Sequence, residues 1–228
     1  MVRTLGTLAL ALVTLWPGPA SACRLALLLA LDVSSSVDDA EYLLQRNGLA
    51  AALTNPEVQS AFLATGLPVA ISAFEWSGRY NHQTILDWRM IRSRSDLLAA
   101  SEAIASTSRS TSDFPTAIGY ALGHAALLLS KAPDCERKTV DVSGDGENNE
   151  GFGPALAYRH FPLSGVTVNA LAIGGSTPLN ELVTYFRREV IRGPGAFVET
   201  ALNYSDFEEA IRRKLEREVA MRVVGEVR

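Results

Sequence analysis

Six short segments of the chain have the polarity pattern of β-strands, and the segments between them have that of helices. Most of the six are unbroken apolar runs ended by polar turn residues, which is typical of strands buried on both faces of a parallel sheet. The third alternates polar and apolar residues, as an edge strand does, and follows the second closely enough for a hairpin. The predicted strands cover residues 25–31, 67–76, 83–91, 139–143, 165–173 and 196–200. Strands that alternate with helices in this order predict an α/β sandwich with a mostly parallel sheet.

Local signals place the ends of several helices. Two pairs of polar residues have the spacing of a helix capping box, namely Asp38 with Glu41 and Ser205 with Glu208. Asn55-Pro56 ends the first helix, and its core-facing side is predicted to hold Leu43, Leu44, Leu49, Ala50 and Leu53. Pro115 suits the first position of a helix, which puts Thr116 in the first turn. The charged residues of the final helix are expected to form a solvent-exposed face.

The start of the chain resembles a secretory signal peptide. Arg3 is followed by a short apolar stretch, by Pro17-Gly18-Pro19 and by a small-residue cleavage pattern that ends at Ala22. The apolar stretch is shorter than a membrane span requires. The mature protein is therefore expected in the periplasm or outside a bacterial cell, with no integral membrane span. We expect a signal peptide, a globular domain and a short C-terminal tail over residues 1–22, 23–222 and 223–228.

Composition and charge restrict the classes of function. Apolar residues make up 47% and charged residues 20% of the 228 residues, as in ordinary globular domains. The formal net charge is −4, and loss of Arg3 with the signal peptide changes it to −5. An acidic protein is a poor match for the phosphate backbone, so we expect no nucleic-acid partner.

The chain has two cysteines, Cys23 and Cys135, and export favours a disulfide between them. Cys23 lies nine residues before Asp32, and Cys135 lies ten before Asp145. If the two strands are parallel neighbours, both cysteines lie at matching amino ends. The bond would close a loop of 112 residues, for which the chain-entropy model allows at most roughly 4 to 5 kcal/mol. The alternatives are two free thiols or a bacterial lipoprotein with lipid on Cys23, which is disfavoured because Ala20 stands where such signals normally have Leu.

Oxygen-bearing side chains gather at one predicted edge of the sheet. Asp32, Ser34 and Ser36 follow the first strand, Asp145 follows the fourth, and Thr116 lies beside the loop before a helix. Ligand sites of open α/β sheets lie at the carboxyl ends of the strands. Hard oxygen ligands suit a cation such as Mg²⁺. The sequence therefore predicts a metal site at this edge.

These loops resemble those of the von Willebrand factor type A (vWA) domain family. The metal ion-dependent adhesion site (MIDAS) of that family combines the pattern D-x-S-x-S, a Thr in a second loop and an Asp in a third. The corresponding segments here are DVSSS at 32–36, TAIG at 116–119 and SGDGE at 143–147. The resemblance covers residues 23–220 and looks most like exported bacterial vWA-like proteins of unassigned function. It implies a three-layer, Rossmann-like sandwich with a six-stranded sheet in which the first and fourth strands are neighbours.

The resemblance also implies the roles of the site residues. Ser34 and Ser36 would bind Mg²⁺ or Mn²⁺ directly. Asp32 and Asp145 would act largely through waters, and Thr116 directly or through a water. In such domains an acidic residue of a protein partner completes the coordination shell. We therefore expect a binding module and not an enzyme.

Several residues near the predicted site depart from the family pattern or invite a second role. Asp113, Phe114 and Pro115 stand where many vWA domains have Gly or Thr, and we expect Asp113 to cap the next helix. Trp76 is expected to be buried, although it lies near the same edge. Glu147 and Asn148-Asn149 are expected to form a turn, not to line the rim of the site.

Two other functions match parts of the pattern. One is a vWA fold kept as a scaffold without a functional metal. The other is a haloacid dehalogenase-type phosphohydrolase, because residues 144–149 resemble the motif G-D-G-x-N-D. That family needs a second carboxylate after its first strand and a final Asp in the motif, and Ser34 and Asn149 occupy these positions. The three histidines, His82, His124 and His160, do not have the sequence spacing of a zinc site.

Overall fold

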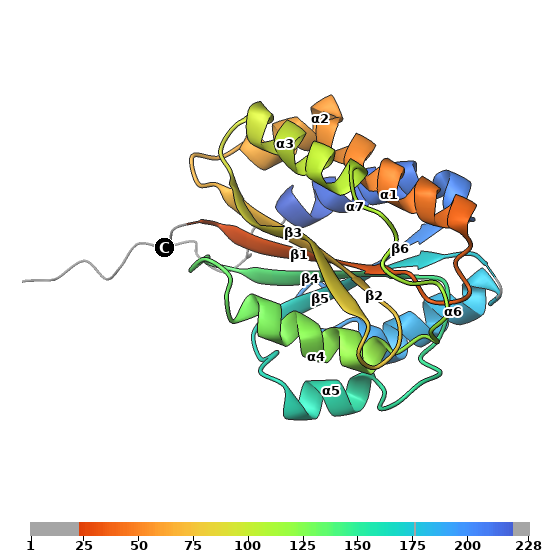
Figure 1. Ribbon diagram of the computed structural model, residues 1–228. Coiled ribbons are helices and arrows are strands. Elements are labelled where there is room, and N and C mark those ends of the chain that lie inside the picture. Colours follow the sequence, from red (N-terminus) through yellow and green to blue (C-terminus); the bar gives the residue numbers. More distant parts are fainter. Residues whose placement is uncertain (1–22, 176, 221–228) are drawn as a thin grey trace, which may run out of the picture.

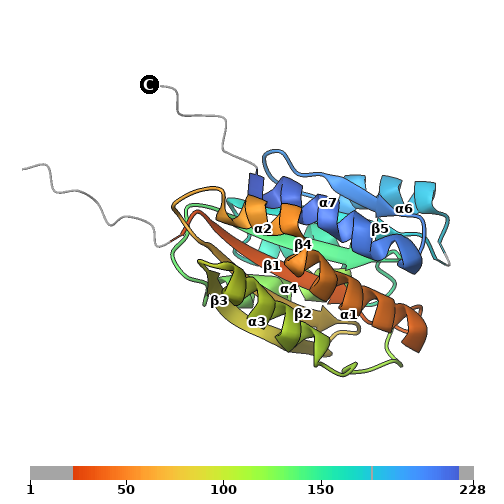
Figure 2. The ribbon, with the colours of Figure 1, turned by 90° about the horizontal axis from the view of Figure 1, so that it is seen from above.

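A central sheet of six strands forms the middle layer of the computed structural model, which describes residues 23–175 and 177–220. Helices cover both faces of the sheet (Figures 1 and 2), so the expected three-layer α/β sandwich is confirmed. The predicted signal peptide and tail lie outside the described residues. The strands are β1 (Leu25–Asp32), β2 (Val69–Trp76), β3 (His82–Ile91), β4 (Lys138–Gly144), β5 (Val166–Ile173) and β6 (Val198–Ala201).

The strands follow the order β3-β2-β1-β4-β5-β6 across the sheet. β1 pairs in parallel with both β2 and β4, and only the edge strand β3 is antiparallel to its neighbour. The expectation that the first and fourth strands are neighbours is therefore confirmed. Asp32 lies opposite Trp76, and Leu31 lies opposite Ser143, so the carboxyl ends of the central strands meet at one edge.

The helices divide between the two faces of the sheet. Side chains of β1 alternate between them: Leu27 and Leu29 pack in one hydrophobic core, and Leu28 and Ala30 in the other. The first face is covered by α1 (Asp39–Thr54), α2 (Pro56–Leu63), α3 (Arg94–Ala105) and α7 (Phe207–Ala220). The second is covered by α4 (Ile118–Leu129), α5 (Pro154–His160), α6 (Leu179–Tyr185) and its π-helical extension (Phe186–Val190). No described helix is long and apolar enough to cross a membrane.

The helix ends differ in part from the sequence prediction. The capping box of α1 forms, because Glu41 N donates to Asp38 Oδ1 at 2.8 Å and Asp38 N donates to Glu41 Oε2 at 2.9 Å. Leu43 and Leu44 were assigned to the core-facing side, but they are 45% and 44% exposed. The turn of α1 instead directs Tyr42 inward, with Gln45, Leu49 and Leu53 on the same buried side.

The predicted Ser205–Glu208 cap is replaced by an earlier one. A short 3₁₀ turn (Tyr204–Asp206) precedes α7, and Asn203 Oδ1 accepts a hydrogen bond from Ser205 N at 2.8 Å. Asn203, which precedes this extra turn, therefore accepts a hydrogen bond from the backbone N–H group of Ser205 at the start of the turn.

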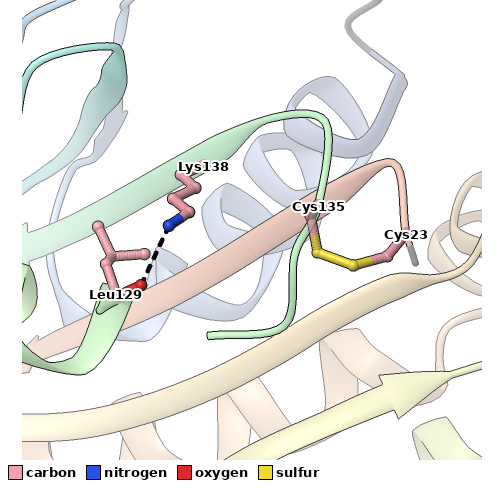
Figure 3. Close-up of a disulfide and its surroundings, with 4 residues drawn as sticks. All are labelled: Cys23, Leu129, Cys135 and Lys138. Atoms are coloured by element: carbon pink, nitrogen blue, oxygen red, sulfur yellow. Dashed lines mark hydrogen bonds between the residues drawn. A yellow bond between two sulfur atoms is a disulfide. The ribbon is translucent and has the colours of Figure 1, made fainter. Parts of the chain in front are cut away.

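The expected disulfide between Cys23 and Cys135 is confirmed (Figure 3). The two residues form a parallel bridge, with Cα atoms 4.5 Å apart and a sequence separation of 112. The backbone reinforces the contact, because Glu136 N donates to Cys23 O at 2.9 Å. The bond joins the amino ends of β1 and β4, which is the edge opposite their polar carboxyl ends.

Candidate functional site

Three loops meet where the central strands end. The first follows β1, the second precedes α4, and the third follows β4. The first and second are joined by Ser35 N, which donates to Phe114 O at 2.8 Å. The second and third are joined by Asn149 N, which donates to Thr116 O at 2.9 Å. Backbone hydrogen bonds therefore fix the three loops relative to one another, independently of the side chains that the loops carry.

The five predicted site residues converge between these loops. Ser36 Oγ donates to Asp145 Oδ1 at 2.7 Å, and the Oγ atoms of Ser34 and Ser36 are 3.2 Å apart. Thr116 Oγ1 donates to Ser34 Oγ at 3.2 Å. Asp32 turns back on the first loop, accepting a hydrogen bond from Ser34 N at 2.8 Å. Residues 113 positions apart in the sequence thus form one cluster of oxygen atoms.

The protein surroundings of the cluster disfavour the charged forms of its two carboxyl groups. Asp32 and Asp145 are 0% and 1% exposed. Burial, and after it the charge of Asp145, raises the pKa of Asp32 to about 8. Burial also raises the pKa of Asp145, against a hydrogen bond from Ser36 that lowers it. Two carboxyl groups this deeply buried require either a proton or an added cation.

This arrangement fits a divalent cation. The Oδ2 atom of Asp32 is buried and has no hydrogen-bond partner among the described residues, so one acceptor oxygen of the cluster is left to bind a cation. The described residues include no group of three or more His, Cys, Asp or Glu side chains that could hold a metal. The cluster instead combines two carboxyl groups with the hydroxyls of Ser34, Ser36 and Thr116. Carboxylates and hydroxyls are hard oxygen ligands, which Mg²⁺ and Mn²⁺ accept.

Thr116 reaches the cluster from a different place than predicted. It lies two residues before α4, not in its first turn, and α4 has no side-chain cap from its own N-cap residue, Ala117. The prediction that Asp113 caps this helix is therefore wrong, and Asp113 is exposed. The third loop supplies the missing acceptors: Asn149 Oδ1 accepts from Thr116 N at 2.9 Å, and Asn148 Oδ1 accepts from Gly119 N at 3.1 Å. Asn148 and Asn149 thus hold the second loop and do more than form a turn.

Arg109 holds the first loop from outside, a role that the sequence analysis missed. Its Nη2 donates to Val37 O at 2.5 Å and to the carbonyls of Val33 and Ser34 at 3.2 Å each. Its Nη1 forms an ion pair with Asp39 at 2.9 Å. Because a single guanidinium contacts three successive parts of the loop, Arg109 fixes the backbone that presents Ser34 and Ser36.

The carboxyl end of β2 supports the site without joining it. Glu75 is buried and accepts hydrogen bonds from Tyr42 OH at 2.8 Å and from Ser110 N at 3.0 Å. Trp76 is fully buried, as expected, and is therefore not a surface contact for a partner. Tyr204, which precedes α7, is also buried, and its pKa is raised by burial and then by the charges of Asp145 and Asp32. This phenol was also missed, because nothing near it in the sequence resembles a site motif.

An open cleft of about 470 Å³ lies over the cluster. Ser36, Thr116, Glu147, Asn149 and Glu181 are among its lining residues. Glu147 and Asn149 therefore do line the rim, contrary to the sequence expectation. Both glutamates are exposed, so the approach to the cluster is acidic.

Comparisons with solved structures show the fold. Proximal thread matrix protein 1 from the mussel byssus matches with a TM-score of 0.62 and 17% identity, over 88% of this chain and 48% of the mussel chain. This chain thus spans about half the length of that protein. A second structure of the mussel protein has a zinc-occupied MIDAS motif. BatB from Bacteroides thetaiotaomicron matches with a TM-score of 0.55 and 21% identity, over 86% of this chain and 98% of BatB.

A von Willebrand factor type A protein from Catenulispora acidiphila matches with a TM-score of 0.53 and 18% identity, over 87% of this chain and 42% of the other. No curated protein matches the chain. A family model described as protein of unknown function, DUF1194, matches residues 22–223. The chain therefore belongs to the DUF1194 family and has the fold of a vWA domain.

Proposed function

We propose that this chain is an exported binding module that holds Mg²⁺ or Mn²⁺ and presents it to a carboxylate of a protein partner. The observation that carries the proposal is the convergence of Asp32, Ser34, Ser36, Thr116 and Asp145, with the Oδ2 atom of Asp32 buried and unpaired. Ser34 and Ser36 are proposed as direct ligands. Asp32 and Asp145 act largely through waters, and Thr116 directly or through a water. The zinc-occupied MIDAS motif of the mussel protein supports metal binding by this fold.

The surroundings of the site support an acidic partner that binds only with the cation. Glu147 and Glu181 flank the cleft, and two more carboxyl groups lie beneath it. An incoming carboxylate would be repelled by this charge unless a cation lies between. A cation with few direct negative ligands retains the positive charge that attracts the partner's group. Partner binding should therefore disappear with EDTA.

Binding is favoured over catalysis by the lining of the cleft. The described residues that line it include no His, Cys or Lys. The carboxyl group that accepts from Ser36 Oγ is that of Asp145, which the proposed cation site uses, so it is not free to act as the base that would make this hydroxyl a nucleophile. The Cys23–Cys135 disulfide supports export, because such bonds persist in oxidising compartments. A periplasmic or secreted location follows from this proposal.

Thermal unfolding with EDTA, Mg²⁺, Mn²⁺ and Ca²⁺ tests the cation site. A ligand that binds only the folded state at about 100 times its Kd adds about 2.7 kcal/mol to the free energy of unfolding. The Tm should rise with Mg²⁺ or Mn²⁺ in the wild-type protein and not in Asp32→Ala. Asp113→Ala is the matched control, because it removes an exposed carboxyl group of the second loop and should respond like the wild type.

An equal Mg²⁺-dependent rise of Tm in Asp32→Ala would contradict the site. No rise with any ion in the wild-type protein would favour the metal-free scaffold.

A further inference from the structure

A second cluster of charged side chains is buried between β4 and α7. It consists of Asp141 from β4 and of Lys214 and Glu218 from α7, none of which is more than 1% exposed. Lys214 Nζ lies 2.7 Å from Asp141 Oδ1 and 2.7 Å from Glu218 Oε1. The expectation that the charged residues of α7 face solvent is therefore wrong for these two. Asn169 completes the cluster by donating Nδ2–H to Glu218 Oε1 at 2.8 Å.

The charges of this cluster are poorly balanced as simple ion pairs. Two carboxyl groups share one ammonium group in a fully buried place. The Oδ2 atom of Asp141 and the Oε2 atom of Glu218 have no hydrogen-bond partner among the described residues, and Oδ1 of Asp141 has the ion pair with Lys214. Burial raises the pKa of Asp141 to about 7, with Lys214 lowering it and Glu218 raising it. Buried ion pairs with such incomplete hydrogen bonding are costly to keep charged.

We infer that Lys214 and Asp141 form an intramolecular isopeptide bond, with Glu218 transferring the protons. The nucleophilic nitrogen lies beside the carboxyl group that it attacks, and a second carboxyl group contacts the nitrogen. Holding both groups together replaces an encounter in solution by a reaction at high effective concentration. Burial keeps out the water that would hydrolyse the product, and the ring of Phe197, 5.4 Å from Lys214 Nζ, contributes to this shield.

The reaction balances without a co-reactant. Glu218 accepts one proton from the Lys214 ammonium, which makes Nζ a nucleophile. Nζ attacks Asp141 Cγ and forms a C–N bond, and Glu218 passes its proton to one Asp141 oxygen. Nζ then loses a second proton to that oxygen as its C–O bond breaks, so the oxygen leaves as water. The ammonium and the carboxylate become a neutral amide, and Glu218 ends in its starting state.

Intact mass measurement of the purified, reduced and denatured protein tests this bond. The wild-type chain should be lighter than its sequence mass by one water molecule. Lys214→Met should have the full mass of its own sequence, since it has no nucleophile. After proteolysis, the wild-type protein should give a branched peptide in which segments of β4 and α7 are joined.

Two conservative variants test the roles of the neighbours. Glu218→Gln keeps the size of the side chain but cannot transfer protons, so it should lose the branched peptide and regain the full mass. Asp141→Asn should still react, but it should release ammonia in place of water. A wild-type chain of full mass, a water loss that maps elsewhere, or an undiminished branched peptide in Glu218→Gln would overturn the inference.

Discussion

Asp32 is the residue whose ionisation is most tightly linked to the proposed cation. Burial raises its pKa from 3.8 to about 8, above the value it has in the unfolded chain. A group whose pKa is raised by folding contributes its full stabilisation at pH values below its pKa in the unfolded chain. This stabilisation is lost as the pH rises through its pKa in the folded protein. The cation-free protein should therefore lose stability between about pH 4 and pH 8.

A cation competes with the proton on Asp32, so the Mg²⁺-dependent rise of Tm should grow between about pH 5 and pH 8. Thermal unfolding with EDTA or Mg²⁺ across this range measures the effect. Asp113→Ala should show the same trend, and Asp32→Asn should show none. An effect of Mg²⁺ that is constant across this range in the wild-type protein would speak against a proton held by Asp32.

His82 gives a pH response of the opposite sign. Its ring stacks on that of His124 at a centroid distance of 4.6 Å, and burial and then the charge of His124 lower its pKa from 6.5 to about 4. The unfolded chain takes up the proton first, so stability present above pH 6.5 is lost as pH falls through about 4. His82→Phe keeps a stacked ring that does not titrate. Urea unfolding at about pH 7.5 and pH 4.5 should show a smaller loss in the variant, and equal losses would contradict the assignment.

The sequence predicted the residues of the candidate site better than it predicted the residues that hold them in place. Asp32, Ser34 and Ser36 stand at fixed spacing after an apolar strand, so a local pattern sufficed. Arg109 acts through carbonyls more than 70 positions away, and no local pattern reports such a contact. Lys214 and Glu218 resembled an exposed charged face because Asp141, which lies beside them, comes from a distant strand.

Among the connecting elements, the loop that carries Arg109 should control the affinity of the cation site. Arg109→Ala removes the hydrogen bonds that hold the first loop but no proposed ligand. Substitution of residues that orient metal ligands typically weakens metal affinity by roughly 10 to 100-fold. Titration of Tm with Mg²⁺ should therefore show a weaker apparent affinity in Arg109→Ala. Arg213→Ala, which removes an ion pair with Glu199 on the surface of α7, should leave the affinity unchanged.

The elements themselves were predicted unevenly. Strands were placed well because unbroken apolar runs can only be buried. α2 was missed because Asn55-Pro56 was taken only as an end, whereas Asn55 Oδ1 also accepts from Glu57 N at 2.8 Å and caps a new helix. The start of α4 was misplaced because its capping acceptors come from Asn148 and Asn149 in another loop.

At the scale of the whole molecule, the disulfide and the candidate site lie at opposite edges of the sheet. Replacing both Cys23 and Cys135 by Ser should lower the free energy of unfolding by about 2–5 kcal/mol, because the unfolded chain regains the freedom of a closed loop. The Mg²⁺-dependent rise of Tm should persist, since no site residue contacts the disulfide. Chemical unfolding measures the first effect and thermal unfolding the second. Loss of the Mg²⁺ response in a folded double variant would contradict this separation.

The location of the disulfide and the candidate site at opposite ends of the central strands has a mechanical consequence. A partner held at the carboxyl edge and an attachment at the amino edge would load the domain along its strands. The disulfide would divide such a load between β1 and β4, which are parallel neighbours at the centre of the sheet. Their hydrogen bonds would then be sheared together and not opened one after another, so the domain would resist extension along this axis more than peeling from an edge strand.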